Sequence, residues 1–298
     1  MATRRLSSGL TLSLCWWGLS CSGQHSDDQV VEVSVPSASA TTSVAVTEPA
    51  THQPARTETF ETCLAEIRKH PVRGPQPDAG ESLYRQALAA EESDLNTARK
   101  LHFKLIDDQR GSAYVAASYF AFGEIFLRDA ETDRSKLSFA EQAYLEALKD
   151  ATSGTPLFWM SRLRLGEVYA QSNEDQKALD SLWKLFRDLD AAPPTERFCA
   201  EDRAGRAFGA VYAATGDPKK AAVFVRGVRQ GRLQNRLLVD VARAYVDKAM
   251  IAEARDVLDG AANAPLERDD YLCTEGRRVV GAITHPPMLK AIERVCAP

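Results

Sequence analysis

The sequence predicts an all-α protein built from repeated helix pairs behind a disordered N-terminal tether. From Phe60 onward, apolar residues recur at spacings of three and four, as on the buried face of an amphipathic helix. No stretch alternates apolar and polar residues for long enough to indicate a sheet. A small residue followed by an aromatic three positions later and an alanine twelve positions later recurs along the chain. Fixed internal periodicity is typical of helical repeat arrays, which usually bind partners.

The first 22 residues have the composition of an export signal. Arg4 and Arg5 precede the apolar run Leu10–Leu19, which is too short to span a bilayer well, and small residues follow it. The stretch Gly18–Cys21 resembles a bacterial lipobox, so we expect a signal peptide over 1–22 and a mature lipoprotein that starts near a lipidated Cys21. Ordinary secretion after cleavage at Ser22 and an uncleaved anchor are the alternatives.

Residues 23–58 are predicted to be a disordered linker. They are rich in Ser, Thr, Ala and Pro, and residues 24–57 contain no aromatic residue, no Leu and no Ile. Such a segment buries too little apolar surface to offset the conformational entropy of folding. A flexible tether between a lipid and a folded domain has this length and composition.

Four cysteines lie beyond the linker, in a chain expected to enter an oxidising compartment. Cys273 and Cys296 flank a short terminal segment, and we expect them to form a disulfide that holds the last helix in place. Cys63 and Cys199 are far apart in an array whose repeats contact mainly their neighbours. For these two, the sequence favours separate buried thiols.

The repeated pattern resembles the tetratricopeptide repeat, a helix-turn-helix unit with the pattern W-x2-L-G-x2-Y followed by A-x3-F. The resemblance implies antiparallel helix pairs stacked as an α-solenoid over residues 59–298, clearest at about 116–262, and capped by helical pairs from about 60 to 110. Successive copies are spaced by 43, 43 and 33 residues from Gly123 to Gly166, Gly209 and Ala242. The matching residues are Leu165, Gly166, Tyr169, Ala178 and Leu182; Phe208, Gly209, Tyr212, Ala221 and Val225; Val241, Ala242, Tyr245, Ala254 and Leu258; and a stretched earlier copy, Phe122, Gly123, Phe126, Ala140 and Tyr144.

Small residues in this pattern have a packing role. A glycine or alanine in the first helix and an alanine in the second are expected where the two helices of a pair approach most closely. A larger side chain there would push the helices apart, and overpacking costs about 1–3 kcal/mol.

The sequence carries no motif for catalysis, for a cofactor or for a metal. It has no phosphate-binding loop, no G-x-G-x-x-G, no H-E-x-x-H, no G-x-S-x-G and no C-x-x-C, and its five histidines share no metal-ligand spacing. The formal net charge of −4 gives no electrostatic footprint for nucleic acid. We therefore expect a protein that is not an enzyme and that has no cofactor and no nucleic-acid partner.

The resemblance also implies which side chains face the concave groove of the array, because family positions two, five, nine and twelve of each first helix line it. Two carboxy-terminal copies place basic residues there, and two earlier copies place apolar and acidic ones. Arginine forks pair well with carboxylates, so the expected partner is a protein with an acidic or carboxylate-terminated segment. The alternative is that the arginines pair with neighbouring helices or face solvent. The groove residues so predicted are Arg203, Arg206, Arg236 and Arg243, with Phe120, Glu124, Met160, Leu163 and Glu167.

Taken together, the sequence favours a non-enzymatic scaffold or adaptor at the cell envelope. It would be an outer-membrane lipoprotein facing the periplasm, in contact with the membrane through its N-terminal lipid. A soluble periplasmic or secreted protein is the alternative location. The alternative function is a structural or polysaccharide-associated accessory subunit that oligomerises through its helices.

Overall fold

The computed structural model describes residues 59–72, 78–261 and 265–297, all of which belong to one compact unit, Ala55–Pro298. Over these ranges the chain is helical apart from turns and connections, and it contains no strand. The predicted all-α class is confirmed. The predicted signal peptide, Cys21 and the tether fall outside the described residues.

Most helices have 10 to 17 residues, and shorter helical turns join some of them. In chain order the elements are α1 (Phe60–Lys69), α2 (Ala79–Ala90), α3 (Leu95–Asp108), α4 (Val115–Asp129), η1 (Arg134–Lys136), α5 (Leu137–Asp150), α6 (Pro156–Gln171), α7 (Asp175–Ala191), α8 (Glu201–Thr215), η2 (Pro218–Lys220), α9 (Ala221–Val225), α10 (Gly231–Asp247), α11 (Ile251–Ala261), η3 (Leu272–Gly276), α12 (Arg277–Ile283) and α13 (Pro286–Cys296).

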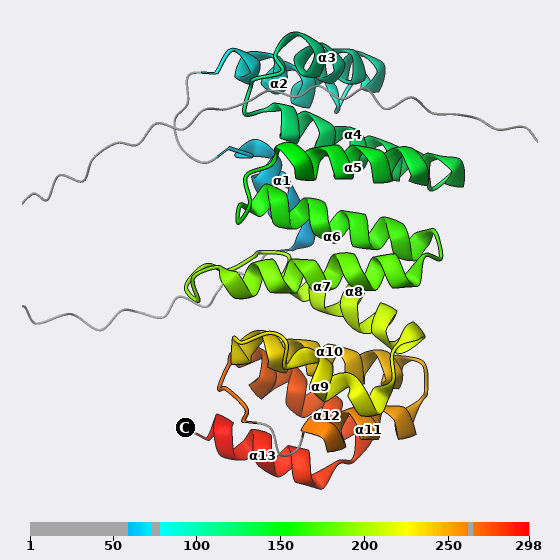
Figure 1. The fold of residues 1–298 in the computed structure, drawn as a ribbon, viewed down its shortest axis with the longest axis vertical. Coiled ribbons are helices and arrows are strands. Elements are labelled where there is room, and N and C mark those ends of the chain that lie inside the picture. Colours follow the sequence, from blue (N-terminus) through cyan, green and yellow to red (C-terminus); the bar gives the residue numbers. More distant parts are fainter. Residues whose placement is uncertain (1–58, 73–77, 262–264, 298) are drawn as a thin grey trace, which may run out of the picture. The chain divides into compact units, whose positions relative to one another are not determined.

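Consecutive helices pack against each other. Close contacts join α2 to α3, α4 to α5, α6 to α7 and α10 to α11, and further contacts join α3 to α4, α5 to α6 and α7 to α8. Figure 1 shows these pairs following one another in chain order from α2 and α3 towards α13. The first copy of the sequence pattern is stretched because η1 lengthens the connection between α4 and α5.

Polar side chains cap the N-termini of several helices. The side chain of Asp78 accepts a hydrogen bond from the backbone N–H of Gly80, and that of Asp94 accepts from two backbone N–H groups of α3. Thr155 caps α6 in the same way, directly before Pro156 at the first helical position. These caps satisfy N–H groups that have no partner inside the helix, so the helix boundaries follow local sequence signals.

Small residues of the repeated pattern lie at the helix contacts. The alanines at 140, 178, 221 and 254 are fully buried. A Cβ atom added at Gly123 would lie 2.4 Å from the ring of Tyr144, and one at Gly166 would lie 2.7 Å from Leu182. Both contacts are within a helix pair, as the sequence predicts.

Gly209 makes its close approach to a different helix. A Cβ atom there would lie 2.4 Å from the backbone carbonyl oxygen of Asp240, which belongs to α10. Because α9 is only five residues long, α8 packs against α10 instead. At this position the small residue serves the contact between successive pairs, and even an alanine is too large.

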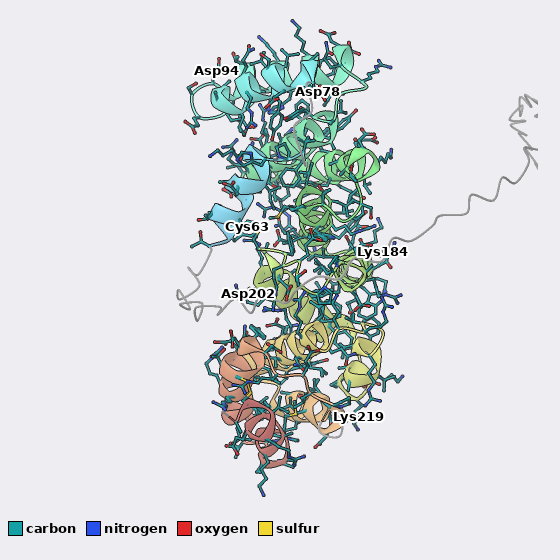
Figure 2. The ribbon with its side chains drawn as sticks, turned by 90° about the vertical axis from the view of Figure 1, so that its left-hand side faces the viewer. Cys63, Asp78, Asp94, Lys184, Asp202 and Lys219 are labelled. Carbon is teal, nitrogen blue, oxygen red and sulfur yellow. A yellow bond between two sulfur atoms is a disulfide. The ribbon has the colours of Figure 1, made fainter. Side chains whose placement is uncertain are left out.

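Helix α1 departs from the chain-order stacking. The sequence predicts that it joins the pairs capping the array, but it lies against α6 instead (Figure 1). Cys63 of α1 forms a disulfide with Cys199, just before α8, with 5.6 Å between the Cα atoms. Figure 2 shows Cys63 on this helix. The expectation of two separate thiols is wrong, because it assumed that only neighbouring repeats touch.

The two disulfides differ in what they join. Cys273 and Cys296 connect η3 to the end of α13, with a sequence separation of 23 residues and 5.7 Å between the Cα atoms. Cys63 and Cys199 are separated by 136 residues. A bridge that closes so long a loop lowers the entropy of the unfolded chain, which can add up to about 5 kcal/mol to the free energy of unfolding.

Replacing Gly209 with Ala tests the contact between α8 and α10. The added methyl group meets a backbone carbonyl that cannot rotate away, so we expect the free energy of unfolding in urea to fall by about 1–3 kcal/mol. Gly281→Ala is the matched control, because Gly281 is an exposed helical glycine with no atom within 4 Å of an added Cβ. That control should gain up to about 1 kcal/mol. Equal effects at both sites would contradict the assignment.

Candidate functional site

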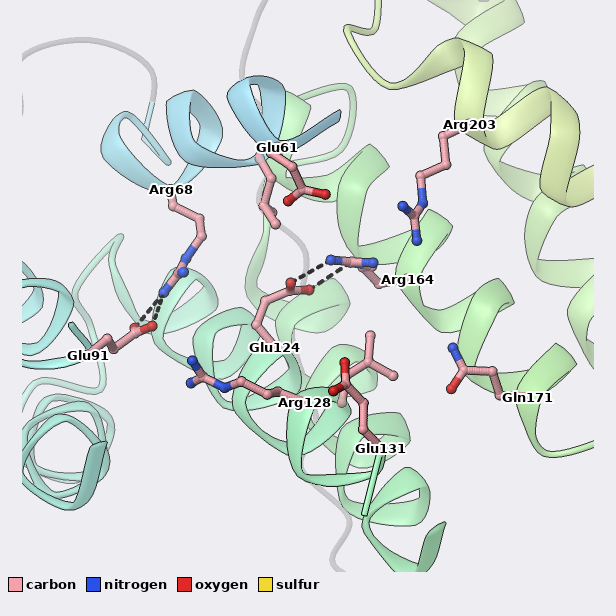
Figure 3. Close-up of a pocket in the computed structure, with 11 residues that line it drawn as sticks. Glu61, Arg68, Glu91, Glu124, Arg128, Glu131, Arg164, Gln171 and Arg203 are labelled. Carbon is pink, nitrogen blue, oxygen red and sulfur yellow. Dashed lines mark hydrogen bonds and ion pairs between the residues drawn. The ribbon is translucent and has the colours of Figure 1, made fainter. Parts of the chain in front are cut away.

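A cleft of about 360 Å³ lies between α1, α4, α6 and α8 (Figure 3). We call it the charged cleft, because eight of its eleven lining side chains are arginine or glutamate. Its lining residues are Glu61, Leu64 and Arg68 of α1; Glu91 after α2; Glu124, Leu127, Arg128 and Glu131 of and after α4; Arg164 and Gln171 of α6; and Arg203 of α8.

A relay of ion pairs links three helices at the base of the cleft. Arg164 donates from Nε and Nη2 to the two carboxylate oxygens of Glu124, at 2.8 and 2.7 Å, as Figure 3 shows. Its Nη1 donates to Glu167 at 2.9 Å, and the other oxygen of Glu167 accepts from Arg203 at 2.5 Å. Bidentate, charge-assisted hydrogen bonds of this kind are among the strongest in proteins.

The relay stabilises the buried charge of its central cation. Burial acts to lower the pKa of Arg164, but the negative charges of Glu124 and Glu167 raise it above the ordinary value of an arginine. The hydroxyl of Tyr144 donates a further hydrogen bond to Glu124 at 2.6 Å. Helices α4, α6 and α8 are therefore held in one relative orientation by these charged side chains, because each of them would be costly to bury without its ion-pair partner.

A second ion pair closes the cleft beside α2. Arg68 donates to both oxygens of Glu91 at 2.5 Å, and His102 Nε2 lies 3.1 Å from the same carboxylate. Burial acts to raise the pKa of Glu91, but the hydrogen bond with His102 and the charge of Arg68 lower it overall. The carboxylate of Glu91 is thus ionised and fully engaged.

Three charged groups of the cleft are not engaged in this way. Glu61, Arg128 and Glu131 are exposed, and none makes a side-chain hydrogen bond or ion pair with another described residue. In Figure 3 these side chains surround the Arg164–Glu124 pair. Among the described residues, Arg128 is the cleft's free cation, because Arg68, Arg164 and Arg203 each have a carboxylate partner.

The structure brings together only part of the predicted groove. Glu124, Glu167 and Arg203 meet in the relay, two of them lining the cleft. Phe120, Met160 and Leu163 do not face a groove, because they are buried in the core. The prediction for these three residues is wrong. Their helices, α4 and α6, pack against the helices that precede and follow them.

The predicted basic half of the groove is also different. Arg236 pairs with Glu201 and Asp202, and Arg243 pairs with Asp240 and Glu275. Both guanidinium groups lie over the ring of Tyr271, at 3.8 and 5.8 Å from its centroid. The segment that carries Tyr271 therefore covers this face of α10, and the alternative of salt bridges with neighbouring helices holds for these two arginines.

Arg206 differs from the other predicted arginines. It is exposed on α8 and has no ion pair among the described residues. Its positive charge acts on the buried Asp240 of α10. Arg206 is thus a surface cation above a buried carboxyl group, outside the charged cleft.

Asp240 is an unusual acid in this region. Tyr271 donates a 2.5 Å hydrogen bond to its Oδ1, whereas its Oδ2 faces Gly205 and has no hydrogen-bond partner among the residues that the structure describes. Burial raises the pKa of Asp240 to about 6, although the Tyr271 hydrogen bond and the charges of Arg243, Arg236 and Arg206 lower it. The folded protein therefore holds a proton at Asp240 more tightly than the unfolded chain does.

Sequence reasoning missed Arg128 as a residue of the charged cleft. Arg128 and Gln171 occupy the same place in successive first helices, five residues after Gly123 and Gly166 respectively. That shared offset was available in the sequence. The mapped groove positions stop one residue earlier, and so they end at Leu127.

In the part of the chain that the structure describes, no three His, Cys, Asp or Glu side chains gather to hold a metal ion. None of the helices described there is long and apolar enough to cross a membrane. The sequence matches no protein-family model, and no curated protein is significantly similar to it.

Replacing Asp240 with Asn tests the raised pKa. A pKa that folding raises from 3.8 to about 6 contributes stability that is fully present below about pH 4 and is lost as the pH rises through 6. We expect the free energy of unfolding of the natural protein, relative to Asp240→Asn, to fall by about 2 kcal/mol between pH 4 and pH 7. Urea denaturation at both pH values measures it. Asp247→Asn, exposed on the same helix, is the control. A difference between the natural protein and Asp240→Asn that stays constant with pH would contradict the assignment.

Proposed function

We propose that the unit is a tetratricopeptide-like α-solenoid that acts as a non-enzymatic protein-binding scaffold, with the charged cleft as its partner site. The ligand is a protein segment that presents a carboxylate. The observation that carries this proposal is Arg128, an exposed cation with no ion pair among the described residues, in a cleft whose other arginines are neutralised.

The packing of the helices supports the architectural part. Consecutive pairs contact each other in chain order, and buried alanines recur at the same place in four of them. Solenoids of this kind use the face formed by successive first helices to hold extended segments. The charged cleft is lined by three first helices, α4, α6 and α8.

The charges of the cleft restrict the ligand. Arg128 can bind a carboxylate by donating two parallel N–H···O hydrogen bonds to it. Glu61 and Glu131 line the same cleft and would repel a run of acidic residues. The favoured ligand is therefore a single carboxylate, of a side chain or a chain end, next to neutral or basic groups.

Crosslinking in cells that produce the protein tests this function. A photo-reactive residue at Gln171, which is exposed in the cleft, should capture a partner that mass spectrometry identifies. Arg128→Glu should lower the captured amount about tenfold, as loss of about 1.4 kcal/mol of binding free energy predicts. Arg187→Glu, exposed on α7 and without an ion pair among the described residues, is the matched control. Equal capture with both variants would refute the site.

We also propose that the scaffold is exported to the cell envelope and anchored through a lipid on Cys21, with residues 23–58 as its tether. The basic start, the short apolar run and the lipobox-like Gly18–Cys21 support it. Cys21→Ser should move the protein from the membrane fraction to the soluble fraction, and mass spectrometry should find a diacylated Cys21 in the natural protein. Unmodified Cys21 in membrane-bound protein would contradict the anchor.

A further inference from the structure

Helix α1 covers the relay of the charged cleft. Its buried face carries Cys63, Leu64 and Ile67, and its Glu61, Leu64 and Arg68 line the cleft. The ring of Phe60 lies against two arginines of the relay, with centroid distances of 4.7 Å to Arg164 and 4.0 Å to Arg203. A helix far from its place in chain order thus occupies the surface where successive first helices meet.

The two halves of α1 are attached in different ways. Within the described residues, its hydrogen bonds and ion pairs to other helices come only from Arg68 and Lys69, at its C-terminal end. Arg68 pairs with Glu91, and the carbonyl groups of Arg68 and Lys69 accept from Tyr84 and Arg85 of α2. The N-terminal half has the Phe60 contacts and the disulfide to Cys199.

Because of this attachment, the N-terminal half of α1 depends on the disulfide to stay on the surface of the cleft. A ten-residue helix is not stable in water by itself, so α1 stays folded only while it is held on its surface. Without the bridge, Phe60 and a few apolar contacts are all that hold the half that covers Arg164 and Arg203. The polar contacts of Arg68 and Lys69 would remain as a hinge.

We propose that α1 is a latch on the charged cleft, locked by Cys63–Cys199, and that a dithiol reductant opens it for the partner segment. The inference rests on the proposed function, since it concerns access to the same site. A thiolate of the reductant attacks one sulfur and displaces the other as a thiolate. The second thiol of the reductant then resolves the mixed disulfide. Two electrons and two protons pass to Cys63 and Cys199, and the reductant leaves as a disulfide.

The open form would present a different surface. Once Phe60 leaves, the guanidinium faces of Arg164 and Arg203 are free to hold an aromatic ring of the partner. Arg128 lies in the same cleft and is available for its carboxylate. The partner segment is therefore expected to carry an aromatic residue close to its carboxylate.

Hydrogen exchange on the full chain tests the latch without reference to any partner. In a Cys273→Ser/Cys296→Ser background, the reductant dithiothreitol has only Cys63–Cys199 to break among the described cysteines. We expect the backbone amides of α1 to exchange at least about 100-fold faster after reduction, with changes below about threefold in α4 and α6. Cys63→Ser/Cys199→Ser is the matched control, in which α1 exchanges fast before and after the reductant is added.

Two results would overturn the latch: amides of α1 that exchange at the same rate after reduction, or amides of α1, α4 and α6 that accelerate together. The second result would mean that the bridge holds the whole fold. Crosslinking through Gln171 then separates the two proposals. Capture that rises on reduction supports both. If α1 opens but capture through the cleft is insensitive to Arg128→Glu, the proposed function fails and the latch stands. Capture that is sensitive to Arg128→Glu and equal before and after reduction overturns the latch alone.

Discussion

The guanidinium of Arg164 is removed from water between three helices, and burying its charge there is costly unless carboxylates pair with it. Glu124 of α4 and Glu167 of α6 supply them, and Glu167 extends the relay to Arg203 of α8. Removing one partner from such a buried set typically costs about 3–5 kcal/mol, a large fraction of the roughly 5–15 kcal/mol by which a folded protein is stable. The relay thus fixes how the three helices are placed relative to one another. The shape of the charged cleft beside them depends on this placement.

The chain covers two faces of its first helices with aromatic rings. Phe60 lies against Arg164 and Arg203, and Tyr271 lies against Arg236 and Arg243. In both places a planar cation that is already paired with carboxylates offers its face to a ring, which shields it from water at little cost. The charged cleft lies beside the first of these covers, because Arg164 and Arg203 both line it. The surface available to a partner is therefore set by the segments that the chain folds back on itself.

Local features of the sequence predict where the helices lie, but they do not predict the contacts between segments far apart in the chain. Apolar spacing and caps such as Asp94 fix where a helix lies, and the repeated alanines fix which face is buried. Neither kind of signal states that α1 returns to α6, because that contact joins residues about 100 positions apart. Arg236 and Arg243 illustrate the same limit. Their residue type predicts a carboxylate partner, but only the fold shows that the carboxylates belong to Glu201, Asp240 and Glu275.

The return of α1 also changes how the array holds together. In a stack where each pair contacts only its neighbours, the end pairs open independently of the middle. Here α1 is bound to α2 through Arg68 and Glu91, and to the start of α8 through Cys63 and Cys199. The outermost pair, α2 and α3, and helix α8 are thereby joined across α4 to α7. When α2 and α3 move away, α1 must either be strained or be released. Opening at this end of the stack is therefore coupled to the charged cleft in its middle.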